Sequence, residues 1–123
     1  MATVLTNTGK AIVTNRLKGA GTEPLNVAWG TGAGTAAITD TTLFTEATPR
    51  GAGTSTQQTT TVTNDTYQVV ATLTAGGALT ITNAGLFDVI TASSGNLFVK
   101  GDFTGVVLAT SDSIQFTIKC QFS

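Results

Sequence analysis

The feature that most constrains the fold of this chain is an unbroken alternation of apolar and polar residues near residue 117. Every second position is apolar, namely Ile114, Phe116, Ile118, Cys120 and Phe122, and polar residues fill the positions between them. Successive side chains of a β-strand point to opposite faces of a sheet, so the pattern predicts a strand with one buried face. A second layer of structure is needed to cover that face.

Weaker strand patterns precede it, separated by glycine, asparagine and aspartate turns. Strand is expected mainly over residues 25–30 and 57–122, with individual segments at 57–63, 66–75, 79–88 and 97–103. The segments on either side of Asn64 and Asp65 are expected to pair as a hairpin. Strands recurring with short turns are typical of an antiparallel β-sandwich or a barrel-like fold.

One short helix is expected near the N-terminus, over about residues 7–18. Asn7 or Thr8 is expected to cap it, and Gly19 to end it. The predicted fold class is therefore mainly β, as a single domain over residues 1–123 with one short N-terminal helix.

The segment from 38 to 53 is harder to assign. Pro49 lacks a backbone N–H, so any strand around it is expected to be short or to lie at a sheet edge. Gly51 to Gly53 is expected to be flexible.

Charge is scarce in this chain. Only 11% of its 123 residues are charged, where about 25% is usual. The six basic residues are scattered, so no basic patch for nucleic acid is expected. Apolar runs are too short to span a bilayer and no secretory signal is evident, so we expect a soluble chain without a membrane partner. The strands carry Thr, Gln and Ser opposite their apolar faces, which favours a wet protein interface.

The residues for common catalytic and metal sites are missing. The chain has no histidine and one cysteine, Cys120, which excludes Ser-His-Asp and Cys-His catalysis and thiolate zinc clusters. No pair of acids stands out by spacing, so we expect no enzyme and no cofactor. Gly32 to Ala37 satisfies a loose dinucleotide fingerprint, but the residues after it are poor helix formers, so a loop is expected.

Three aspartates, Asp88, Asp102 and Asp112, fall near predicted turns. They have two interpretations, calcium ligands or ordinary turn residues. Without a cluster of spaced acids the turn interpretation is favoured, and no metal site is expected.

Several short motifs resemble structural proteins of tailed bacteriophages. They occur in the order Thr6–Ala11, Val27–Gly32, Thr42–Ala47 with Arg50, Thr82–Asp88 and Gly95–Phe98. The order resembles the N-terminal domain of phage tail-collar fibre proteins. The whole chain, ending in Gly101–Phe103 and Gly105–Phe116, also resembles small capsid decoration, or cement, proteins.

This resemblance implies a virion component made in the cytoplasm of a host bacterium. Because no fibre shaft or coiled-coil repeat is present, a decoration protein on the capsid surface is favoured. It would be a homotrimer that binds the major capsid protein between capsomers. A tail, collar or fibre-attachment component is the alternative, and a carbohydrate-binding module of similar architecture is a third.

Candidate contact residues for these partners come from the predicted helix, the glycine-rich loop and the Pro49 region. They are Lys10, Arg16, Lys18, Trp29, Thr31 and Arg50. For Trp29, ordinary core packing is the stronger interpretation, because a lone tryptophan is more often packed than presented. The three helix cations have a simpler interpretation as solvated side chains.

Overall fold

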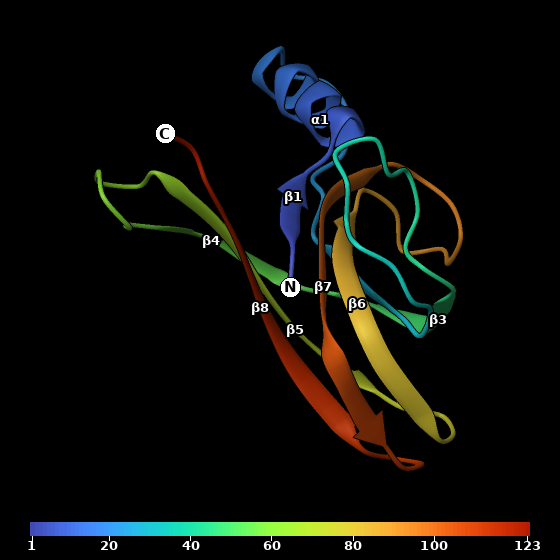
Figure 1. Ribbon diagram of the computed structural model, residues 1–123. Coiled ribbons are helices and arrows are strands. Elements are labelled where there is room, and N and C mark those ends of the chain that lie inside the picture. Colours follow the sequence, from blue (N-terminus) through green and yellow to red (C-terminus); the bar gives the residue numbers. More distant parts are fainter.

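The computed structural model describes residues 1–123 and confirms a mainly β fold with one short helix. In chain order the elements are β1 (Thr3–Leu5), α1 (Asn7–Leu17), β2 (Asn26–Gly30), β3 (Glu46–Ala52), β4 (Thr54–Gln58), β5 (Thr66–Thr74), β6 (Leu79–Phe87), β7 (Leu97–Leu108) and β8 (Ser113–Gln121). One antiparallel sheet has the strand order β1-β7-β6-β2-β3, and the other has the order β4-β5-β8. The two sheets form a sandwich (Figure 1).

The main core lies between the sheets. Trp29 on β2 is fully buried, and its ring meets that of Phe116 on β8 edge to face, with centroids 6.3 Å apart. Val69 and Leu73 on β5 fill the same layer. Burying side chains of this size stabilises a fold by about 1.5–3 kcal/mol each. The alternation predicted for β8 is present, with its even-numbered residues facing this core.

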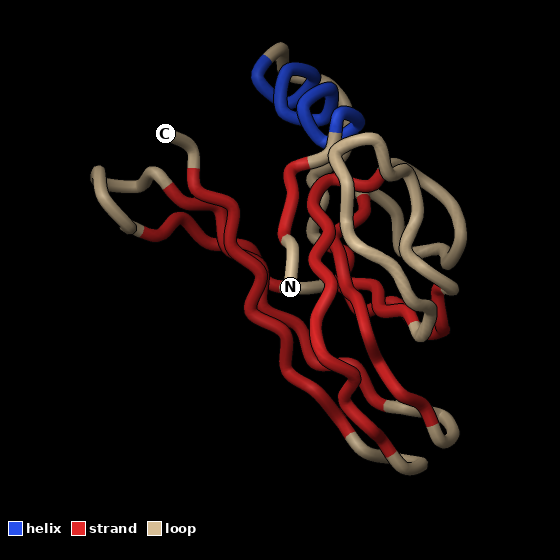
Figure 2. Tube along the Cα trace, viewed as in Figure 1, coloured by secondary structure: helices blue, strands red, loops and turns tan.

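The helix begins earlier than the capping residues suggested. Its N-cap is Thr6, not Asn7 or Thr8: the Thr6 Oγ1 accepts a hydrogen bond from the Gly9 N–H at 2.9 Å. The same hydroxyl donates to the Leu97 carbonyl at 2.7 Å, and this contact with β7 could not be read from local sequence. Gly19, with φ of 88°, follows the C-cap as expected. Figure 2 shows α1 across one end of the sandwich.

Residues 46–58 carry the chain from one sheet to the other. β3 pairs with β2 at the edge of the five-stranded sheet, as expected for a strand containing Pro49, and β4 pairs with β5. Between them the Gly53 N–H donates to the Leu25 carbonyl at 2.8 Å, and a Cβ at Gly53 would collide with Val69. The prediction of a flexible stretch at Gly51 to Gly53 is therefore wrong, because these glycines serve close packing.

A hairpin forms between β4 and β5, but the predicted strand over 57–63 is wrong: β4 is Thr54–Gln58, and the turn is longer than Asn64 and Asp65. Residues 59–65 connect the strands, and the Asp65 carboxylate accepts hydrogen bonds from the backbone N–H groups of Val62, Thr60 and Thr61. These bonds, those of Val62 and Thr60 first, hold the pKa of Asp65 well below its ordinary value. The side chain thereby fixes the loop.

A layer of coil covers the second face of the five-stranded sheet. The segments 31–45 and 88–96 contain no helix or strand, and they lie against this sheet on the side away from β8 (Figure 2). A small apolar cluster fills the contact, made of Ala28, Leu43, Phe87 and Leu97. The five-stranded sheet is therefore buried on both faces along β2 and the adjoining residues 83–87 of β6 and 97–100 of β7.

Candidate assembly surface

The outer face of the three-stranded sheet has no covering element (Figure 1). Strand register places a set of mostly neutral side chains there, which we call the bare face: Thr54, Thr56, Gln58, Gln68, Val70, Thr72, Thr74, Ser113, Gln115, Thr117, Lys119 and Gln121. Lys119 is the only charged residue among them. The neutral strand faces expected from the sequence thus meet on one surface.

Strand β8 forms one edge of this sheet and has a free side along its whole length. It pairs with β5 over nine residues in an uninterrupted antiparallel register. The Phe122 N–H donates to the Asp65 carbonyl, which continues that ladder. Because backbone groups alternate sides in such a ladder, the N–H and C=O groups of the odd residues 113–121 point to the free side.

The remaining edge strands are short or interrupted. β1 has three residues, β4 has five, and β3 contains Pro49. Short strands and prolines are devices that prevent edge-to-edge pairing. β7 pairs with β6 but has no neighbour on its β1 side over 103–108, where Gly105 and the adjacent Val106 and Val107 interrupt the alternation of apolar and polar residues. β8 is therefore the one long, regular and unprotected edge of the molecule.

An open groove lies beside β8, between it and strands β1 and β7. Its volume is about 490 Å³. Val4, Leu5 and Phe103 line one wall, and Phe116 and Ile118 line the other. The β3 to β4 crossover joins the sheets on the opposite side, whereas no ladder joins β7 to β8. The sandwich is thus closed on one side and open on the other.

Cys120 lies in the wall of this groove and is half-buried. Burial raises the pKa of its thiol, so the thiolate is disfavoured. The position suits the sequence-based interpretation of this residue as a small apolar side chain of a strand.

The three predicted helix cations are exposed but lie away from the bare face. Lys10, Arg16 and Lys18 belong to α1 or its C-cap, at the end of the sandwich. The Arg16 Nη1 donates to the Gly21 carbonyl at 2.9 Å, and its side chain lines a second groove of about 320 Å³ under α1. If these three residues contact a partner, they do so through a surface separate from that of β8.

Trp29 is not available as a contact residue. Its exposed fraction is 0%, because β2 is an inner strand between β6 and β3 and its indole faces the other sheet. The core interpretation was therefore right, and its place among the candidate contacts was wrong. Thr31, the next candidate, is half-buried where the coil layer begins, and its N–H donates to the Thr45 carbonyl.

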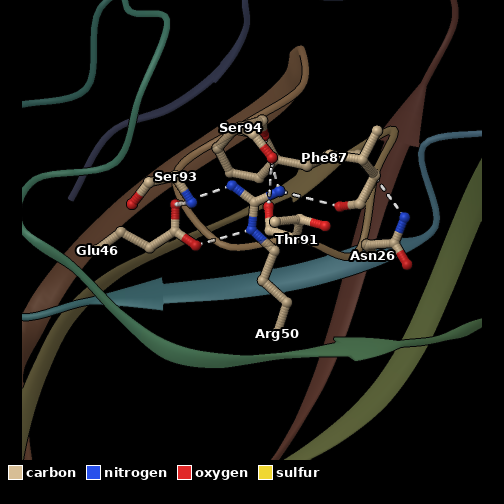
Figure 3. Close-up of polar contacts among 8 residues, drawn as sticks. Asn26, Glu46, Arg50, Phe87, Thr91, Ser93 and Ser94 are labelled. Carbon is tan, nitrogen blue, oxygen red and sulfur yellow. Dashed lines mark hydrogen bonds and ion pairs between the residues drawn. The ribbon is translucent and has the colours of Figure 1, made fainter.

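Arg50 is also wrong as a surface contact, because it is an internal clamp (Figure 3). Its guanidinium forms a two-pronged ion pair with Glu46, at 2.7 and 2.9 Å, and donates to the carbonyls of Val89 and Ser94 at 2.9 Å. It lies 3.7 Å above the Phe87 ring. Arg50 thereby fastens the 88–96 segment to β3.

Lys100 fastens the other coil segment in the same manner. Its ammonium donates to the Asp40 carboxylate at 2.9 Å and to the Thr42 carbonyl at 2.8 Å, and it lies 3.3 Å from the centre of the Phe44 ring. No helix opens after Gly32 to Ala37, so this glycine-rich segment is the loop that the sequence predicted. Sequence reasoning missed Lys100 because its partners are about sixty positions away.

The three aspartates that were weighed as calcium ligands lie in separate places. The carboxylates of Asp88 and Asp112 accept hydrogen bonds from the backbone N–H groups of Asn96 and Ala109, which is typical of turn residues. Asp102 accepts from Ala36 and Ala2, and these bonds, that of Ala36 first, lower its pKa. The structure contains no group of three acidic or thiol side chains able to hold a metal ion.

Comparison with known protein families, characterised proteins and solved structures finds no match to this chain. No helix in the structure is both long enough and apolar enough to cross a membrane. Evidence of function therefore comes from the surface of the molecule, above all from β8. Sequence reasoning identified β8 as a strand but not as an edge. Its residues include no proline, no glycine and one charge, a composition that is equally typical of a central strand, so the sequence held no signal for the edge position.

Proposed function

We propose that this chain is a non-enzymatic structural subunit of a bacteriophage particle, which works by binding copies of itself and neighbouring virion proteins. The observation that best supports the proposal is the bare face with the unprotected edge of β8. A neutral hydrogen-bonding surface enters an interface without the cost of burying charge. A free protein would normally protect such an edge and such a face with charged side chains.

Within the particle, we favour a capsid decoration protein on the head surface, bound to the major capsid protein where capsomers meet. A subunit that binds only the assembled lattice stabilises that lattice by mass action, and the effect is repeated at every equivalent site. The four cations left on the surface are spread over α1, its cap and β8, so direct binding to nucleic acid forms no part of the proposal.

Two alternatives have less support. A tail, collar or fibre-attachment component rests on motifs such as Gly85 to Asp88, which here end β6 and begin a clamped coil segment. These residues serve packing, so they do not favour one virion location over another. A carbohydrate-binding module needs exposed aromatic rings in a row. Trp29 is buried, and the Tyr67 ring packs against Phe98, so neither residue contributes to an exposed row of aromatic rings.

The test is to locate the chain in purified particles of the phage that encodes it. A decoration protein is expected at hundreds of copies per particle by quantitative gel staining, whereas a tail component is expected at no more than dozens. Particles lacking it should lose heat resistance while keeping adsorption. Absence from particles would overturn the proposal, and normal shells with non-adsorbing tails would favour the tail alternative.

A further inference from the structure

The strand β8 is complementary to a second copy of itself. Rotated by a two-fold axis at Thr117, two β8 strands run antiparallel with all nine residues overlapping. Residue pairs are then Thr117 with Thr117, Gln115 with Lys119, and Ser113 with Gln121. All of these are the odd residues whose backbone groups point to the free side, so each pair can exchange two hydrogen bonds.

The side chains match in the same register. Even residues meet even residues, so Phe116 faces Ile118 and Ile114 faces Cys120 of the second copy, all on the face that packs against the core. Aromatic and β-branched cross-strand pairs of this kind stabilise sheets. A strand added at β8 therefore extends the apolar wall of the groove and shields its half-buried side chains from water.

Charge also agrees with this occupant. Lys119 is the only ionisable residue on the outer face of β8, and the register sets it opposite Gln115 rather than opposite another lysine. The two lysines lie four residues apart along the strand, about 14 Å, beyond the Debye length at physiological salt. A second copy thus meets no electrostatic penalty at this edge.

We propose that two copies of this chain associate through β8, joining their three-stranded sheets into one continuous sheet with the order β4-β5-β8-β8-β5-β4. This inference rests on the proposed function, since it names the partner of the same surface. The resemblance to phage proteins implied a trimer, whereas an isologous strand contact of this kind pairs two copies.

The first test substitutes Thr117 at the centre of the free edge. Thr117→Pro removes an N–H that has no partner within one chain but is bonded in the pair, so sedimentation should change from dimer to monomer. Thr117→Val keeps the N–H and should remain a dimer. Circular dichroism checks that both variants fold. A monomeric parent chain, or a Thr117→Pro variant that folds and keeps the parent's association, would overturn the proposal.

A second test fixes the register and does not depend on proline. In a Cys120→Ala background, Thr117→Cys places two thiols on the axis, with Cα atoms about 5.5 Å apart, within disulfide range. Oxidation should link most of this variant as covalent dimers. Gln115→Cys places its two thiols about 14 Å apart and should stay unlinked, but it should link when mixed with Lys119→Cys. Equal linking of the first two variants would contradict the register.

These results separate the two proposals. If the chain is abundant in particles but the variants at Thr117 associate and link no differently from the controls, the β8 contact is wrong and the virion role stands. If the contact forms as described and the chain is missing from particles, the contact stands and the virion role is wrong.

Discussion

The two sheets of the sandwich differ in what covers them. The five-stranded sheet is buried on both faces along β2 and the adjoining parts of β6 and β7, by the other sheet on one side and by the coil segments 31–45 and 88–96 on the other. The three-stranded sheet is buried on one face, and its outer face and the β8 edge are open. The outer face of the five-stranded sheet is covered by coil and not by helices or strands.

Coil is a poor packing layer unless its polar backbone groups are satisfied. Here two buried cations do this: Arg50 bonds the carbonyls of Val89 and Ser94, and Lys100 bonds that of Thr42. Each cation is also neutralised by a carboxylate, Arg50 by Glu46 and Lys100 by Asp40 in the other coil segment. A chain with only six cations has thus placed two of them inside the covered half.

Removal of Arg50 is expected to have the largest effect on the covered sheet. Arg50→Met leaves the buried Glu46 carboxylate without its counter-charge, with the Ser93 N–H at 3.3 Å as a remaining donor, and removes the donors to two carbonyls. It should lower the free energy of unfolding by about 3–5 kcal/mol. Urea unfolding followed by circular dichroism measures the change. The exposed Arg16→Met is the matched control, expected within about 0.5 kcal/mol. Equal losses in both variants would contradict the role of Arg50 as a clamp.

The apolar part of the covering coil should behave like an ordinary core. Leu43 is 5% exposed although it lies in a loop, so Leu43→Ala should cost about 3 kcal/mol of unfolding free energy. Ile38, in the same segment and 51% exposed, provides the control: Ile38→Ala should change little. The same urea measurement applies, and a small effect at Leu43 would mean that the coil does not pack as a layer.

The second cation gives a smaller effect, because its carboxylate partner is less buried. Lys100→Met should cost about 2 kcal/mol, since Asp40 is 22% exposed and keeps its hydrogen bond from the Ala37 N–H. Lys119→Met removes the only cation of the bare face and should leave the stability of the single chain unchanged. A loss at Lys119 as large as that at Lys100 would remove the distinction between the two sheets.

The pH dependence sharpens the assignment of Asp40. Burial raises the pKa of Asp40, but the hydrogen bond from the Ala37 N–H and the Lys100 ammonium together lower it by more. The pKa of Asp40 in the folded chain is therefore below its ordinary value. Its stabilising contribution is then full above the unfolded pKa and is lost as pH falls through the folded pKa. The stability difference between parent and Asp40→Asn should therefore shrink between about pH 5 and pH 2. A difference constant over this range would contradict the ion pair.

The smallest effect is expected on the bare face. Thr72 lies on the central strand β5 and is exposed, so Thr72→Lys should change the unfolding free energy by no more than about 0.5 kcal/mol. Thermal unfolding of the dilute chain measures this. A large loss would show that the face is packed against something within the chain and is not open.

The sequence alone located β2, β5, β6 and β8 and the apolar face of β5 and β8, although it missed β1 and wrongly placed strand at residues 59–63. The alternation in β8 and β5, the helix and the edge position of the Pro49 strand were readable because these properties depend on neighbours within a few residues. The neutral character of the bare face could be predicted for the same reason, since the two-residue period of a strand places its Thr and Gln residues on one side.

The tertiary structure alone decided where each strand lies and which side chains are buried. Whether β8 is a central strand or an edge depends on the pairing of strands, and whether Arg50 and Trp29 reach solvent depends on what packs over them. Arg50 and Lys100 look like surface cations in sequence because their carbonyl partners are some forty to sixty residues away. Local preferences carry no information about contacts between such distant segments, and those contacts separate the covered sheet from the open one.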